Sequence, residues 1–173
     1  MRVESTGFTG QDLERFLEEL VERDREVLVQ RLQRASARLA ELAPRVPEEP
    51  PSDSPTWNAR EVLAHVAVLS KFYGVTAYRI GRGELAELDL AGQVALRDVQ
   101  GERLARLPAA ELLAMAQADH RRTLDWLARA SPPELRRRCD MGGGLSMSAE
   151  EVLRLPLCAH LEQHLEQLEA ALP

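Results

Sequence analysis

The chain has 173 residues, which suffice for one domain with a hydrophobic core and are too few for two substantial ones. Its formal net charge of −6 argues against a nucleic-acid partner or an anionic membrane surface, both of which attract basic proteins. Apolar residues make up 45% and aromatic residues only 4%, with Ala, Leu, Glu and Arg abundant, so the composition predicts an all-α protein.

The first ten residues, MRVESTGFTG, contain an acid and lack the apolar core of a signal peptide. Elsewhere no apolar run approaches the roughly 20 residues of a membrane span. We therefore expect a cytoplasmic protein with no membrane partner. Residues 1–8 are expected to be a flexible N-terminus, and 9–173 a single helical domain.

Between residues 9 and 43, apolar side chains recur at three- and four-residue steps, which predicts one long amphipathic helix or two collinear ones. Thr9 and Asp12 form a plausible cap at its start. The segment 44–55, PRVPEEPPSDSP, cannot be helical because its prolines remove backbone donors, so it is predicted to be a long linker.

A second helix is predicted from Thr56, as its N-cap, to the glycines near residues 81–83. The region 84–107 is less regular, with a shorter helix somewhere in it. Pro108 then opens a third long helix that runs to about Ala130, and residues 131–144 form a glycine-rich connection.

The last helix is predicted to begin at a capping box of Ser148 and Glu151. Pro156 lies inside this helix, where it frees a backbone carbonyl and bends the axis. Four long helices with connections of these lengths predict a four-helix bundle.

Two histidines of the last helix, His160 and His164, stand four residues apart and so share one helix face. They fall at the edge of the leucine-rich arc and point toward the bundle interior or its rim. A buried imidazole needs partners for both nitrogens, and a metal ion would satisfy this pair at once. Alternatively, each is a hydrogen-bonded core or rim histidine.

The sequence HLEQH excludes a zinc-protease helix, because there a glutamate directly follows the first histidine and here that residue is Leu161. A di-iron bundle is also excluded, since it needs Glu-x-x-His pairs on two helices and the chain lacks them at His65, His160 and His164.

His65, in the second helix, shares a face with Val62 and Leu69 and is expected to point inward. Two histidines from the last helix and one from the second can form a three-histidine site. Such a site leaves positions open for water or substrate, as catalytic rather than structural metal sites do.

The order Trp57, Glu61 and His65, followed about a hundred residues later by His-x-x-x-His, resembles the DinB-like (DinB/YfiT) superfamily. This resemblance implies a four-helix bundle whose metal ligands are His65, His160 and His164, with zinc or nickel as the ion. It also implies an activity, because members with known activity include thiol-S-transferases and isomerases that use bacillithiol or mycothiol.

The leading functional hypothesis is thus a metal-dependent S-transferase that acts on a small-molecule substrate with a low-molecular-weight thiol. A divalent ion favours thiolate over thiol, which suits this chemistry. The same ion could lower the pKa of a water molecule for hydrolysis. A non-catalytic metal-binding or stress-related bundle is the third alternative, and the sequence does not choose among them.

Three further residues are candidates for the site's surroundings. Glu61 could orient His65 as a hydrogen-bond acceptor, or serve the helix start. His120, in the third helix, could line the pocket, or be a hydrogen-bonded core residue. Tyr73 could contact substrate, or fill the core. Trp57 is expected to pack where the second helix begins.

Arg136, Arg137 and Arg138 could receive an anionic cofactor such as a carboxylated thiol, or form a solvated surface. Of the two cysteines, Cys158 is interpreted as an apolar filler, and Cys139 has no assigned role. Exposed apolar stripes on long helices also favour a homodimer.

Overall fold

The computed structural model describes residues 9–48 and 56–172, and the predicted flexible N-terminus and most of the predicted linker lie outside these ranges. Its elements, in chain order, are α1 (Gly10–Leu42), η1 (Ala43–Arg45), α2 (Ala59–Arg82), α3 (Leu90–Leu104), α4 (Ala109–Leu127), α5 (Pro132–Arg136), β1 (Arg138–Asp140), β2 (Ser146–Ser148), α6 (Ala149–Val152), η2 (Leu153–Ala159) and α7 (His160–Ala171). The protein is all-α apart from one short β-hairpin, as the composition predicts.

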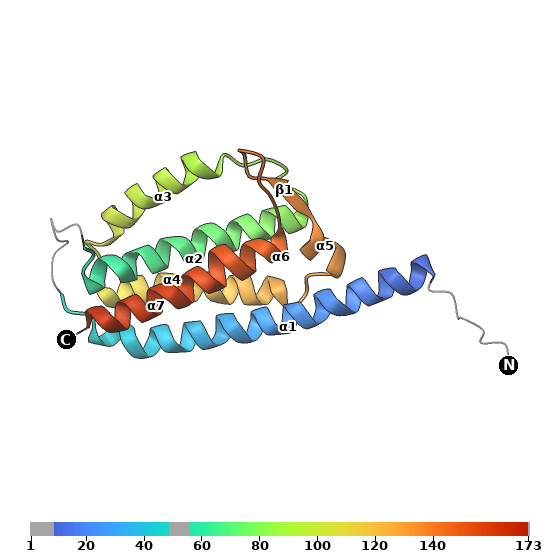
Figure 1. Cartoon of the computed structure of the whole chain (residues 1–173). Coiled ribbons are helices and arrows are strands. Elements are labelled where there is room, and N and C mark those ends of the chain that lie inside the picture. Colours follow the sequence, from blue (N-terminus) through green and yellow to red (C-terminus); the bar gives the residue numbers. More distant parts are fainter. Residues whose placement is uncertain (1–8, 49–55, 173) are drawn as a thin grey trace.

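Four long helical segments form the bundle, namely α1, α2, α4 and the α6–η2–α7 rod (Figure 1). Helix α2 contacts both α4 and α7, and α1 contacts the same two helices from the opposite side. The core between them consists mainly of aliphatic side chains. Its largest fully buried members are Leu28, Leu32, Leu39, Leu42, Leu63, Leu69, Ile80, Leu112, Leu127, Leu135, Leu153 and Leu157. None of the described helices is both long and apolar enough to cross a membrane.

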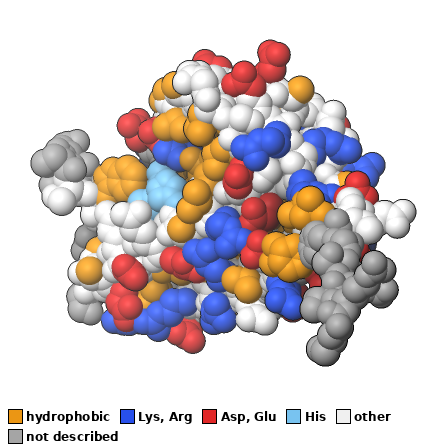
Figure 2. Space-filling view, turned by 45° about the vertical axis from the view of Figure 1, so that its right-hand side comes forward, with side chains coloured by type: hydrophobic (Ala, Val, Ile, Leu, Met, Phe, Trp, Pro, Cys, Tyr) orange, Lys and Arg blue, Asp and Glu red, His pale blue; other side chains and the backbone are white. Residues whose placement is uncertain are grey.

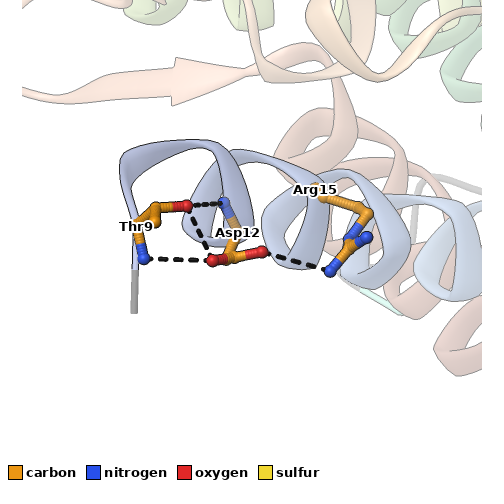
Figure 3. Close-up of polar contacts among 3 residues, drawn as sticks. All are labelled: Thr9, Asp12 and Arg15. Atoms are coloured by element: carbon orange, nitrogen blue, oxygen red, sulfur yellow. Dashed lines mark hydrogen bonds and ion pairs between the residues drawn. The ribbon is translucent and has the colours of Figure 1, made fainter. Parts of the chain in front are cut away.

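Helix α1 is one continuous helix, and its N-terminal end extends past the rest of the bundle (Figure 1). Its first turn is closed by the predicted cap, which is a full capping box: the Asp12 amide donates to Thr9 Oγ1 at 3.2 Å and the Thr9 amide donates to Asp12 Oδ2 at 3.1 Å (Figure 3). The first buried residue of α1 is Leu28, so the apolar stripe before it faces solvent.

Helix α2 begins two residues later than predicted, with Asn58 rather than Thr56 as its N-cap. The reason is the capping box: the Asn58 side chain accepts from the Glu61 amide at 3.0 Å, and Glu61 Oε2 accepts from the Asn58 amide at 2.8 Å. Thr56 is too far from Glu61 in sequence for this reciprocal pattern. The helix ends at Gly83, as predicted, where φ is 74° and a side chain would be strained.

The irregular region between α2 and α4 contains the expected shorter helix, α3, which packs on α2 outside the bundle (Figure 1). Helix α4 starts directly after Pro108, which is its N-cap, and ends at Leu127 rather than Ala130. The predicted connection at 131–144 is more ordered than expected, because it contains α5 and the first strand of the β1–β2 hairpin.

The last helical rod starts at the predicted capping box, where the Glu151 amide donates to Ser148 Oγ at 3.1 Å. Its middle part, η2, is π-helical and contains Pro156. Because proline lacks an N–H group, the α-helical hydrogen-bond pattern cannot continue through it, and a π-helical segment is one way to accommodate the gap. The segment ends where His160 begins α7.

Candidate metal centre

The three predicted histidines lie together inside the bundle, although His65 is separated from the other two by about a hundred residues of sequence. The ring centroids of His160 and His164 are 4.5 Å apart, and those of His65 and His164 are 4.6 Å apart. One nitrogen from each ring can be chosen so that all three lie within 4.8 Å of one another. His65 and His164 are buried, and His160 is half-buried.

Hydrogen bonds orient two of these rings. His164 Nδ1 lies 2.9 Å from Gln167 Oε1, which can only accept, so Nδ1 carries the proton and Nε2 presents its lone pair. His160 makes a hydrogen bond to the backbone carbonyl of Pro156, which lies in the π-helical segment. Partners of this kind set the tautomer and angle of metal-binding imidazoles.

Two of the buried nitrogens, His65 Nε2 and His164 Nε2, have no hydrogen-bond partner in the described part of the chain. Leaving a buried polar atom without a partner costs about 1–3 kcal/mol. A divalent cation accepts lone pairs from both nitrogens and removes that cost. The residues present therefore fit a metal ion, and with three neutral imidazoles the ion would keep open coordination positions.

Burial keeps these imidazoles neutral. It lowers the pKa of His65 to about 3, and the neighbouring His164 imidazole, the Arg97 guanidinium and the His160 imidazole lower it further, since a proton on His65 would be repelled by the Arg97 charge and by any proton on the other two rings. Burial is also the largest cause of the lowered pKa values of His160 and His164. Metal binding requires deprotonated imidazoles, so protons compete weakly with a metal ion at neutral pH.

Two aromatic side chains flank the histidines. The Trp57 ring lies 4.7 Å from that of His65, and its side chain is 41% exposed, so it lies between the site and solvent. On another side, the Tyr73 ring lies 6.3 Å from that of His160. Figure 2 shows histidine side chains at the molecular surface beside hydrophobic ones, so the centre is accessible from outside.

Arg97 is a residue of the site's surroundings that sequence reasoning missed. It is the one buried residue of α3, and its Nη1 donates to the Tyr73 hydroxyl at 2.9 Å. Its charge lowers the pKa values of all three site histidines. No local pattern marks it, because its burial depends on how α3 folds back onto α2.

Glu61 and His120 have structural partners of their own. Glu61 caps α2, which is the helix-start role considered from the sequence. His120 is fully buried, with Nε2 2.8 Å from Ser70 Oγ, and is not part of the three-histidine group. Since the Ser70 hydroxyl donates to the Val66 carbonyl at 2.7 Å, the geometry assigns the Nε2 proton to His120. Burial lowers the pKa of His120 to about 4.

The structure does not bring Arg136, Arg137 and Arg138 to the histidines. Arg137 donates to the carbonyl of Gly81, near the C-terminal end of α2, and His65 lies sixteen residues earlier in that helix, or about 24 Å along its axis. Arg138 pairs with Ser146 and Glu151. The Arg138–Glu151 pair joins the hairpin to α6, and the side chains of all three arginines are exposed.

An all-α bundle whose second and last long helices contribute three converging histidines defines a helical-bundle protein with a candidate metal centre. The family model of the DinB superfamily matches residues 12–168, and the chain belongs to this superfamily. This confirms the resemblance inferred from Trp57, Glu61 and the three histidines. No curated protein and no solved structure matches the chain significantly.

Proposed function

We propose that this protein is a metal-dependent enzyme that transfers a low-molecular-weight thiol to an electrophilic small molecule. The observation that carries the proposal is the pair of buried, unpartnered nitrogens at His65 and His164, beside a half-buried third ligand, His160. Such an arrangement supports a site that holds an ion and leaves one side of it open. Zinc and nickel are the proposed ions, because both accept imidazole ligands.

A bound divalent ion would supply one chemical effect, which is to favour the thiolate form of a bound thiol. The thiolate sulfur would then form a bond to an electrophilic carbon, whose leaving group departs with the bonding electron pair. Both of the chain's own cysteines are buried, and burial raises the pKa of Cys158 to about 11. The nucleophile is therefore proposed to be an external thiol such as bacillithiol or mycothiol.

Metal binding is the first test. Protein purified without a histidine tag and loaded with Zn²⁺ or Ni²⁺ is expected to hold about one ion per chain, measured by mass spectrometry of the metal content. His160→Ala should lower the affinity, because it removes one of three ligands while leaving the buried pair in place. His120→Asn is the matched control and should bind normally. A wild-type protein without metal would contradict the site.

Turnover is the second test. The metal-loaded protein is incubated with bacillithiol or mycothiol and a panel of electrophiles, and thioether products are measured with and without chelator. Chelator-sensitive thioether formation supports the transferase. Chelator-sensitive hydrolysis without thiol would instead support a metal-dependent hydrolase on the same residues, and metal binding without any turnover would support a non-catalytic metal-binding bundle.

A further inference from the structure

A cleft between α2 and α3 lies beside the metal centre and is not part of it. It has a volume of about 480 Å³, within the usual range for small-molecule sites. One face of α3, from Gln93 to Leu104, forms one wall, and the segment of α2 that follows His65 forms the other. The cleft therefore begins within two residues of a proposed metal ligand.

The walls of this cleft are mostly apolar and leave a space between them. They include Phe72, Val75, Leu88, Leu96, Leu104 and Met115. Leu96 is 61% exposed, and the only buried residue of α3 is the charged Arg97. Helix α3 buries its apolar residues only in part, Leu90 and Leu104 among them, and the cleft leaves room for an apolar molecule between the two helices.

The charges at the cleft are all positive. Lys71, Arg79 and Arg97 line it, and no aspartate or glutamate does. Within the described ranges, Lys71 and Arg79 make no ion pair, whereas Arg97 pairs with the exposed Asp98 at 2.8 Å. In a chain of net charge −6, a basic apolar cleft is selective for an anion.

Arg97 connects the cleft to the metal centre. Its side chain lines the cleft, and its Nη1 donates to the Tyr73 hydroxyl, whose ring lies 6.3 Å from that of His160. A molecule that contacts Arg97 in the cleft would thus be separated from His160 only by the side chains of Arg97 and Tyr73.

We propose that the α2–α3 cleft binds a small organic carboxylate with an apolar body, which packs between the helices while Lys71 and Arg79 attract its negative charge. This inference rests on the proposed function only in making that molecule the substrate of the metal centre. Binding in the cleft requires no metal, so the two proposals can fail separately.

The test compares three ligands with the same hydrocarbon chain and different head groups, namely octanoate, octan-1-ol and octylammonium. Each is titrated into the metal-free full chain, and amide chemical shifts are followed by NMR. We expect octanoate to bind about fivefold more tightly than octan-1-ol, and octylammonium to bind most weakly, since each partly exposed charge contributes modestly. The shifts should map to α2 and α3.

In a Lys71→Gln/Arg79→Gln variant, the preference for octanoate over octan-1-ol should fall to within about twofold, while octan-1-ol affinity stays unchanged. Arg82→Gln is the matched control, because Arg82 lies on α2 but pairs with Glu134 at 3.2 Å, outside the cleft. The Arg82→Gln variant should keep the preference for octanoate over octan-1-ol.

Equal binding of the three ligands to the wild type, or chemical-shift changes confined to other elements, would overturn the proposal. Failure of Zn²⁺ or Ni²⁺ binding in a protein that still prefers octanoate would overturn the proposed function alone.

Discussion

At the scale of single residues, the centre depends on which ring nitrogen of a histidine already donates a hydrogen bond, because the other nitrogen is then the one that can bind a metal ion. Gln167 accepts from His164 Nδ1 and so leaves Nε2 for a ligand. His160 has a backbone partner in the Pro156 carbonyl. These partners lie one turn away on the same helical rod, so the rod both supplies two ligands and fixes their orientation.

Removing the Gln167 acceptor should weaken metal binding without removing a ligand. We expect Gln167→Leu to lower Zn²⁺ affinity by about tenfold, because outer hydrogen-bond partners commonly contribute 10- to 100-fold. A competition titration against a chromophoric chelator measures this. Gln163→Leu changes an exposed glutamine on the same helix and should bind normally. An unchanged affinity in Gln167→Leu would show that the hydrogen bond does not orient the ring.

The depressed histidine pKa values also predict how stability changes with pH. The His65 pKa is near 6.5 when the chain is unfolded and about 3 when it is folded, so the unfolded state binds more protons as the pH falls below 6.5. Stability is thus fully present above that value and decreases below it, by up to about 1.4 kcal/mol per pH unit for each such group.

Urea unfolding of the metal-free protein at pH 7.0 and pH 5.5 tests this expectation. The free energy of unfolding should be lower at pH 5.5, and the difference should shrink in His65→Gln. The interval lies above the normal titration range of carboxylates, which limits their contribution. Equal stability of the wild type at the two pH values would contradict the expected burial of neutral imidazoles.

At the scale of elements, the capping boxes at the start of α1 and at the start of the α6–η2–α7 rod lie in very different settings. Ser148 and Glu151 begin the rod that carries two site histidines, directly beside the buried Ala149 and Val152. Thr9 and Asp12 begin α1, and even Asp12 lies sixteen residues before Leu28, the first buried residue of the helix. The hydrogen bonds of the two caps are alike, but only the Ser148 cap adjoins the cooperative core.

Loss of the two caps should therefore have different consequences. We expect Ser148→Ala to lower the free energy of unfolding by about 1 kcal/mol, the usual value of an N-cap. Thr9→Ala should leave the unfolding midpoint unchanged and slightly reduce the helical circular dichroism signal, because the exposed end of α1 can fray locally. Equal midpoint shifts in the two variants would show that the start of α1 is part of the cooperative unit.

At the scale of the whole molecule, α1 projects from the bundle with an apolar stripe that is not covered in the described part of the chain (Figure 1). The stripe consists of Leu13, Phe16, Leu17, Leu20 and Val27. It is the face to which the sequence-based expectation of a homodimer applies, since the remaining apolar residues of α1 are largely in the core.

If this stripe is buried between two copies, the protein should be a dimer by light scattering at micromolar concentration. Phe16→Glu/Leu20→Glu should then convert it to a monomer, because two charges would be buried without partners. Leu145→Glu, at an exposed position beside the hairpin, is the control and should not alter the mass. A wild-type monomer across the concentration range would contradict the expected dimer.

The sequence predicted those features that depend on neighbouring residues. The caps at Thr9 and Ser148, the end of α2 near Gly83 and the shared face of His160 and His164 all follow from contacts three or four residues apart. The placement of His65 opposite that pair is a long-range feature. The sequence predicts it for two reasons: His65 and the His160–His164 pair all lie on inward-facing helix positions, and the superfamily resemblance points to the same three residues.

Only the tertiary structure decided which other polar groups lie near the centre. Arg97 is buried beside Tyr73 because α3 packs on α2, whereas His120 is turned toward Ser70 and Arg137 is held at the far end of α2. A helical periodicity states which face of a helix is apolar, but it does not state which neighbour that face meets. Contacts between distant segments depend on the packing of the whole bundle, and that packing is what places a basic cleft beside the three histidines.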